Sequence, residues 1–128
     1  MLLFPKENIN DKNYLKICPS GELLDRKGRL VKFDDSDYIY EVAIFKVDGK
    51  LYCVNNHCPH QNAPEICNGI VKGTFVTCPL HGWTYNLVDG SNAQPNRGLK
   101  RLSNFDIIEH NGWIYIEIPN IPIPKWRR

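Results

Sequence analysis

The sequence of 128 residues carries little surplus charge of either sign, because 16 lysine and arginine residues stand against 14 aspartate and glutamate residues. A formal net charge of +2 does not provide the concentrated basic surface that contacts with phosphate groups require. Aromatic and basic residues are not interleaved in a way that would stack on bases. The composition therefore argues against nucleic-acid binding as the main activity.

Long apolar runs are also missing. No stretch approaches the roughly 20 apolar residues that cross a membrane. Charged residues follow directly after residues 1–5, and this segment is too short for the core of a signal peptide, which needs about 7–15 apolar residues. We therefore expect a soluble, cytoplasmic protein without a membrane anchor.

A helical spacing of apolar residues is missing as well. Short runs rich in β-branched and aromatic residues instead alternate with turn signals, of which Asp48-Gly49, Asp89-Gly90 and Asn111-Gly112 are the strongest. This pattern predicts an all-β fold of short antiparallel strands. The expected strands cover 14–17, 38–40, 42–47, 51–54, 74–77, 83–87, 105–109 and 113–118.

Cysteine and histidine gather in two short motifs. Cys58 and His60 stand in Cys-Pro-His, and Cys78 and His81 stand in Cys-Pro-Leu-His, with a segment of hairpin length, 61–77, between them. Each motif offers one thiolate and one imidazole. This mixture suits a [2Fe–2S] centre in which two histidines replace two cysteines on one iron.

The two motifs, followed by Gly82 and Trp83, resemble the signature of Rieske iron–sulfur proteins, in particular small Rieske-type ferredoxins, Rieske domains of ring-hydroxylating oxygenases and nitrite-reductase small subunits. The similarity of pattern extends over about 42–118. It implies a Rieske-like antiparallel β-sandwich, in which 1–128 form a single domain with a small inserted cluster-binding subdomain at about 56–91. It also implies one [2Fe–2S] cluster, with Cys58 and Cys78 on a shielded iron and His60 and His81 on a more exposed iron.

Zinc is the alternative for the same four ligands, since zinc also accepts two cysteines and two histidines. Structural zinc sites usually contain closely spaced pairs of cysteines or pairs of histidines, and neither motif of this sequence is such a pair. The spacing therefore favours the iron–sulfur cluster.

Three further residues bear on the reduction potential, which spans about −150 to +300 mV for Rieske centres. By the resemblance, Leu80 replaces a cysteine of a disulfide that braces the ligand loops in high-potential relatives, and Trp83 replaces a serine that donates to a bridging sulfide. Both departures favour the lower part of the range. Tyr85 stands where those relatives have a tyrosine that bonds a cluster thiolate and so raises the potential, although a packing role in the core explains Tyr85 equally well. Gly82 is expected to permit a tight turn beside the cluster.

The other candidate ligands have simpler interpretations. Cys18 and Cys53 are expected to be small buried hydrophobic residues, whereas the role of Cys67 stays open. His57 directly precedes the first motif, and its place outside the pattern favours a solvated loop residue. The proline-rich tail 119–128 is expected to run extended along the surface.

The pattern favours a one-electron carrier with no catalytic residue of its own, a Rieske ferredoxin that delivers electrons from a reductase to an oxygenase or another redox enzyme. Its partners are expected to dock near His60 and His81. The alternative is a small non-catalytic Rieske subunit of a larger reductase, of the nitrite-reductase small-subunit type. A self-sufficient oxygenase is disfavoured, because such an enzyme needs a further domain with a mononuclear iron held by two histidines and a carboxylate.

Overall fold

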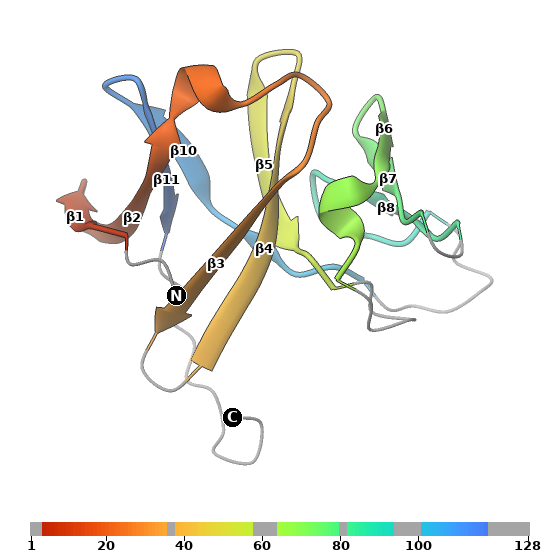
Figure 1. Ribbon diagram of the computed structural model, residues 1–128, viewed down its shortest axis with the longest axis horizontal. Coiled ribbons are helices and arrows are strands. Elements are labelled where there is room, and N and C mark those ends of the chain that lie inside the picture. Colours follow the sequence, from red (N-terminus) through yellow and green to blue (C-terminus); the bar gives the residue numbers. More distant parts are fainter. Residues whose placement is uncertain (1–3, 36–37, 58–63, 80–81, 94–100, 118–128) are drawn as a thin grey trace.

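The protein consists of three antiparallel sheets that lie next to one another (Figure 1). The computed structural model describes residues 4–35, 38–57, 64–79, 82–93 and 101–117. These described residues form eleven strands and two short 3-10 helices, and no α-helix occurs among them. None of the helical turns in these ranges is long and apolar enough to span a membrane. The predicted all-β fold is therefore confirmed.

Each sheet has a simple strand order. The outer sheet has the order β1-β2-β11-β10 and consists of β1 (Lys6–Ile9), β2 (Lys12–Pro19), β11 (Trp113–Glu117) and β10 (Ile107–His110). The central sheet has the order β3-β4-β5-β9 and consists of β3 (Arg29–Asp35), β4 (Tyr38–Val47), β5 (Lys50–Asn55) and β9 (Asn104–Phe105). The small sheet has the order β6-β7-β8 and consists of β6 (Ile70–Lys72), β7 (Phe75–Thr77) and β8 (Thr84–Asn86). The helix η1 (Ser20–Glu22) follows β2, and η2 (Ile66–Asn68) precedes β6.

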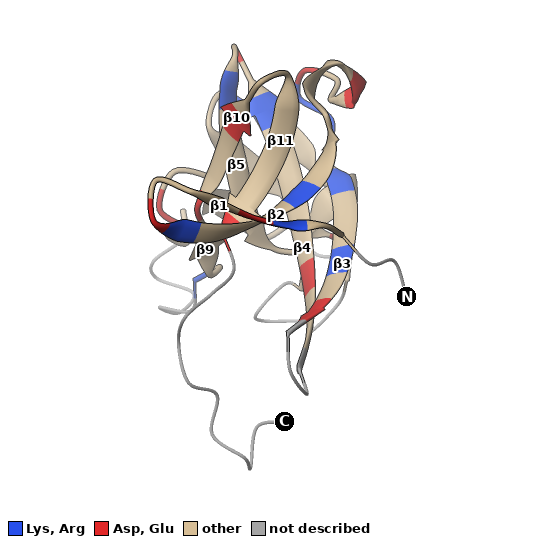
Figure 2. Ribbon diagram, turned by 90° about the vertical axis from the view of Figure 1, so that its left-hand side faces the viewer, with Lys and Arg blue, Asp and Glu red and all other residues tan. Residues whose placement is uncertain are grey.

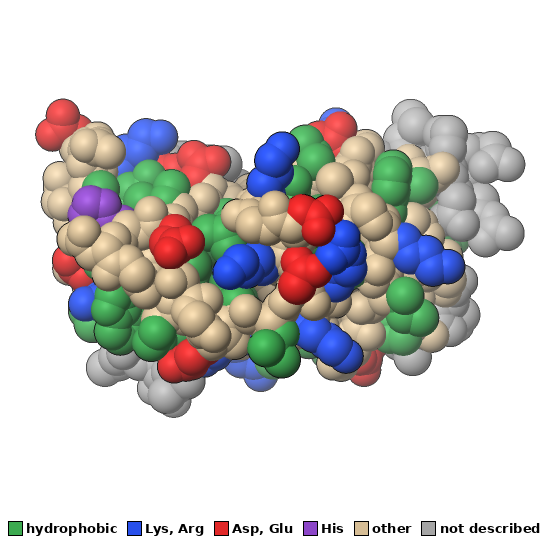
Figure 3. Space-filling model, turned by 90° about the horizontal axis from the view of Figure 1, so that it is seen from above, with side chains coloured by type: hydrophobic (Ala, Val, Ile, Leu, Met, Phe, Trp, Pro, Cys, Tyr) green, Lys and Arg blue, Asp and Glu red, His purple; other side chains and the backbone are tan. Residues whose placement is uncertain are grey.

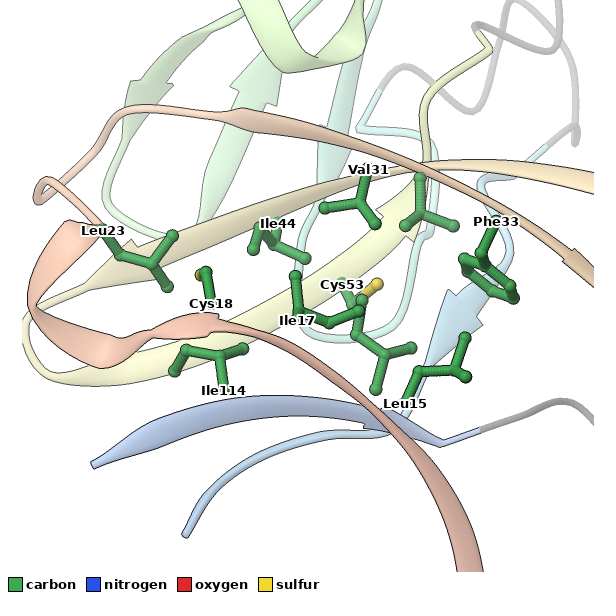
Figure 4. Packing of buried hydrophobic residues seen from close by; sticks show 11 residues of the cluster. Leu15, Ile17, Cys18, Leu23, Val31, Phe33, Ile44, Cys53 and Ile114 are labelled. Atoms are coloured by element: carbon green, nitrogen blue, oxygen red, sulfur yellow. The ribbon is translucent and has the colours of Figure 1, made fainter. Parts of the chain in front are cut away.

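The central sheet is buried on both faces, which explains the continuous apolar run of β4. Ile44 points into a first core between the central and outer sheets, where it meets Leu15, Ile17 and Ile114 (Figure 4), and Val42 belongs to the same cluster. The intervening residues of β4 point the other way, into a second core shared with the small sheet. That second core consists of Ala43, Phe45, Val47, Val54, Ile66, Val76, Cys78, Tyr85, Leu87 and Leu102.

Two predicted hairpin turns are confirmed in detail. Asp48 and Gly49 have φ angles of 51° and 82°, and Asn111 and Gly112 have φ angles of 52° and 78°. Two consecutive positive φ angles match the right-handed twist of the paired strands. At the third predicted turn the chain also reverses, since Tyr85 forms an antiparallel bridge with Asn92.

Several strand boundaries differ from the sequence-based expectation. The segments 38–40 and 42–47 form one continuous strand, β4, whose residues 38–44 pair with the unexpected β3. The expected strand 105–109 is divided at Asp106, because Phe105 pairs with Cys53 of the central sheet whereas Ile107 pairs with Ile116 of the outer sheet. This short segment therefore carries the chain from one sheet to the other.

β1 and β6 were also not expected. β1 has no buried side chain, and it is held by pairing with β2 and by charges on the face of the outer sheet. Figure 2 shows basic and acidic residues interspersed along the strands on this side of the molecule. Glu7 of β1 accepts a hydrogen bond of 3.1 Å from the Tyr115 hydroxyl and lies 3.9 Å from the Lys16 ammonium group. The predicted tail 119–128 lies outside the described residues.

Candidate metal centre

Cys78 lies at the end of β7, where the chain enters the loop 78–83 that joins β7 to β8, here called the second ligand loop. The amide of Cys78 donates to the carbonyl of Trp83 over 2.7 Å, and the amide of Gly82 donates to the carbonyl of Cys78 over 3.1 Å. Gly82 has a φ angle of +75°, which glycine adopts without strain. The two hydrogen bonds thus hold the described ends of the loop, Cys78 and Gly82 to Trp83, close together.

The thiol of Cys78 points inward. Its side chain is fully buried in the second core, together with Ile66, Val76 and Tyr85. A thiolate is expensive to bury without a cation or metal beside it. A thiol buried here is therefore either protonated or bound to a metal, and the place of Cys78 at the start of the Cys-Pro-Leu-His motif distinguishes it from the equally buried Cys53.

The other three predicted ligands, Cys58, His60 and His81, lie outside the described residues, and so does Leu80. The residues that precede both motifs are described, and η2 connects them. The amide of Ile66 in η2 donates to the carbonyl of Asn56 over 3.1 Å. Just beyond η2, Gly69 packs so closely on β7 that a Cβ there would lie 2.8 Å from the carbonyl oxygen of Thr77. The two motifs thus start from neighbouring points on one framework.

The two predicted tuning residues that are described both lie at the second core. Tyr85 is fully buried and pairs with Val76 of β7, while the half-buried Trp83 packs against the same core. Burial of the whole Tyr85 side chain agrees with the packing role, and it also places the hydroxyl inside the protein.

His57 differs from the expected solvated loop residue. Its Nε2 lies 3.3 Å from Oε2 of Glu41 on β4, and its side chain is only 38% exposed. The other carboxylate oxygen of Glu41 accepts a 2.8 Å hydrogen bond from the Asn56 side chain. Burial opposes ionisation of Glu41, but the hydrogen bonds from Asn56 and His57 outweigh it and lower the pKa of this carboxyl group. The sequence did not single out Glu41 or Asn56, because each is an ordinary polar residue within or after a strand.

The remaining cysteines behave as packing residues. Cys18 and Cys53 are buried in the first core, and burial raises the pKa of each thiol, so both remain protonated and inert. This confirms their expected role. Cys67 in η2 is half-buried, and burial and the nearby Glu65 raise the pKa of its thiol. Its amide donates to Oδ1 of Asn56 over 2.7 Å.

The fold is all-β, and in the sequence the first motif lies between β5 and the small sheet while the second lies between β7 and β8 of that sheet, an order of elements that defines a class of iron–sulfur domain. The family model of the Rieske [2Fe-2S] domain matches residues 13–106, so the chain belongs to this family. Members of the family hold one Rieske-type [2Fe–2S] cluster, and the buried thiol of Cys78 fits that group.

Curated relatives fall into two kinds. The chain is 29% identical over 107 residues to the 3-phenylpropionate/cinnamic acid dioxygenase ferredoxin subunit of Shigella flexneri, which covers 84% of this chain and 95% of the relative. It is 29% identical over 85 residues to cholesterol 7-desaturase of Hemicentrotus pulcherrimus and 32% identical over 89 residues to nitrite reductase [NAD(P)H] of Emericella nidulans. These matches cover 59% and 63% of the chain but span only 18% and 8% of those long proteins.

Solved structures share the fold. A nitrite reductase small subunit from Mycobacterium tuberculosis superposes with a TM-score of 0.75 at 24% identity, covering 84% of this chain and 96% of that chain. A ferredoxin of Sphingomonas yanoikuyae B1 superposes with a TM-score of 0.67 at 27% identity, covering 84% of this chain and 100% of that chain.

Proposed function

We propose that the protein is a one-electron carrier, a Rieske ferredoxin that delivers electrons to an oxygenase or another redox enzyme. The observation that carries this proposal is the match to a dioxygenase ferredoxin subunit over 95% of that subunit's length. The desaturase and the nitrite reductase are matched only over a small part of their own length. The shared part is thus the electron-transfer module, and we assign no catalytic residue to it.

Cys58, His60, Cys78 and His81 are the proposed ligands, within a cluster-binding subdomain of about 56–91 inserted in a single domain 1–128. When bound, the cluster accepts and releases one electron at a time, and its two neutral imidazoles make reduction easier than in all-cysteine ferredoxins. The protein contributes a buried thiol at Cys78, a tight second ligand loop, and a second core that excludes water beside them.

Electron transfer requires close approach, so the redox partners are proposed to dock near His60 and His81. The face seen in Figure 3 carries basic, acidic and apolar side chains interspersed. A net charge of +2 gives the chain no strong electrostatic preference for a partner of either sign. A reducing, cytoplasmic location is proposed on the thiols of Cys18, Cys53 and Cys67, which form no disulfide in the described part of the chain.

A small subunit of a larger reductase is the second candidate. It is favoured by the nitrite reductase small subunit of M. tuberculosis, of which the chain covers 96% at a TM-score of 0.75. At 24% identity this likeness concerns the fold. A subunit of this kind should co-purify with its reductase at a fixed ratio, whereas a carrier should be isolated alone and exchange electrons in transient encounters.

The deciding experiment is iron and sulfide analysis of the purified protein, together with electron paramagnetic resonance of the reduced state. Two irons, two sulfides and a signal of low average g-value, typical of mixed cysteine and histidine ligation, are expected. Bound zinc without such a signal would overturn the proposal. Cys78→Ala should abolish the signal, and Cys53→Ala, which also removes a buried thiol but lies in the first core, should retain it.

A further inference from the structure

Asn56 is the one fully buried polar side chain in the described part of the protein, and all of its polar groups are engaged. Its Nδ2 donates to Glu41 over 2.8 Å, and its Oδ1 accepts from the Cys67 amide over 2.7 Å. Its backbone amide donates to the Glu41 carbonyl over 3.0 Å, and its carbonyl accepts from Ile66 over 3.1 Å. This position therefore needs one side chain that donates toward Glu41 and accepts from the Cys67 amide at the same time, and the side-chain amide of asparagine does both.

Glu41 reaches this point from β4 of the central sheet. One of its carboxylate oxygens accepts from Asn56, and the other lies 3.3 Å from Nε2 of His57. Its side chain is 19% exposed, so water competes little for these contacts. The carboxylate thereby holds two successive residues, 56 and 57, against the strand. We call Glu41, Asn56 and His57 the clasp.

The clasp closes a loop. We call residues 56–67 the first ligand segment. It begins at Asn56 and His57, directly before Cys58, and it ends at Ile66 and Cys67 of η2, whose amides bond Asn56. Asn56 therefore joins both ends of the first ligand segment to each other, and Glu41 joins them to the rigid central sheet. The same segment continues through Gly69, which packs against the strand leading to Cys78.

We propose that Glu41 and Asn56 are positioning residues that fix the first ligand segment and thereby set the reduction potential and the magnetic signature of the cluster. This inference rests on the proposed function. Neither side chain is itself a ligand. Hydrogen-bonded partners behind the ligands orient them, and their removal typically weakens metal binding by about 10- to 100-fold. A clasp that only stabilised the fold would change the melting temperature and leave the cluster's properties unaltered.

The test compares purified holoproteins carrying Asn56→Ala, Glu41→Ala or Glu41→Gln. Both alanine variants should shift the midpoint potential, change the g-values of the reduced state and lose the cluster at least about tenfold faster on dilution into chelator. Glu41→Gln should restore values close to those of the unchanged protein, because glutamine keeps an oxygen for the Asn56 amide, and its N–H can donate to Nε2 of His57 when the imidazole carries its proton on Nδ1.

Two controls separate positioning from stability. Asn68→Ala removes an exposed asparagine of η2 whose side-chain amide donates to the half-buried Glu65 over 2.8 Å, so the potential and signal should not change. Ile116→Val trims a buried residue of the first core and should lower the melting temperature without altering the cluster. Alanine variants that lower stability yet keep the potential, g-values and rate of cluster loss would overturn the inference.

Failure of the proposed function gives a different result. If the unchanged protein lacks a Rieske signal, the cluster assignment itself is wrong. The unchanged protein could have the signal while Asn56→Ala does not fold. The comparison of Glu41→Ala with Glu41→Gln then still tests the inference, because Glu41 is partly exposed and its backbone stays within β4.

Discussion

The side-chain hydroxyls of Thr77 and Thr84 lie 2.9 Å apart, one on each of the strands that enter and leave the second ligand loop. The two residues are register partners on β7 and β8, directly beside the backbone hydrogen bond that joins Cys78 to Trp83. The loop is therefore closed by a backbone bond and a side-chain bond at adjacent positions.

Replacing both threonines tests this closure. Thr77→Val and Thr84→Val should each lower the free energy of unfolding, and the double variant should lose less than their sum, since the bond between the two hydroxyls is already lost with the first change. A double-mutant cycle by chemical denaturation should give a coupling energy of about 0.2–1 kcal/mol. Strict additivity would mean that the hydroxyls do not interact in solution.

Gly28 is required where the chain after η1 passes η2. A Cβ at this position would overlap the carbonyl group of Cys67, with the carbonyl carbon at 2.8 Å. Gly28→Ala should therefore lower the free energy of unfolding by about 1–3 kcal/mol, because backbone must move to admit the methyl group. Urea titration measures the change. Gly21→Ala is the matched control, because nothing lies within 4 Å of its Cβ position. An equal loss in both variants would show that the contact with Cys67 is not the cause.

Tyr85 allows the two interpretations of its role to be separated. If its hydroxyl bonds a cluster thiolate, Tyr85→Phe should lower the midpoint potential by tens of millivolts, since about 1 kcal/mol corresponds to about 40 mV for one electron. Tyr52→Phe, which removes a hydroxyl from a residue packed at the edge of the same core, is the control. Protein-film voltammetry measures both. Equal potentials for Tyr85→Phe and the unchanged protein would leave packing as its sole role.

The pair of Tyr115 and Glu7 predicts a loss of stability in alkaline solution. Burial and the adjacent Glu7 carboxylate raise the pKa of Tyr115 above its ordinary value of 10.0. The folded protein thus holds this proton more tightly than the unfolded chain. The resulting stabilisation is complete below pH about 10 and is lost as the pH rises through the pKa of the folded state.

Tyr115→Phe should remove this alkaline dependence, as measured by denaturation between pH 8 and about 11. Tyr14→Phe is the control, since Tyr14 packs edge-on to Tyr115 with ring centroids 6.4 Å apart. The interpretation fails if Tyr115→Phe retains the full alkaline slope.

Local sequence was sufficient to predict a turn where the residue types themselves determine the backbone conformation. The dipeptides Asp48-Gly49 and Asn111-Gly112 predict their hairpins because aspartate, asparagine and glycine tolerate positive φ angles. The turn at Asn10 and Asp11 has the same geometry, with φ angles of 53° and 65°, but lacks a glycine, and β1 beside it buries no side chain. Its pairing depends on Glu7 and on a strand that arrives from the opposite end of the chain.

The sequence predicts the ligands of the site but not the residues that support them. The spacing of cysteine and histidine points to a metal regardless of the surrounding fold, and of the four predicted ligands the structure describes Cys78 alone, with its side chain buried. Glu41 lies 15 residues before Asn56 and becomes its partner only when β4 and β5 pair, so no local pattern reveals the contact. His57 was interpreted as solvated for the same reason.

The burial of β4 on both faces bears on how the protein opens. Val42 and Ile44 belong to the first core, whereas Ala43 and Phe45 belong to the second. Detaching the small sheet would expose one face of β4 to solvent. The opposite face of the same strand packs in the first core, so that core would also lose support. Partial opening at the cluster end is therefore coupled to global unfolding, and the amide protons of β4 should be among the last to exchange with solvent.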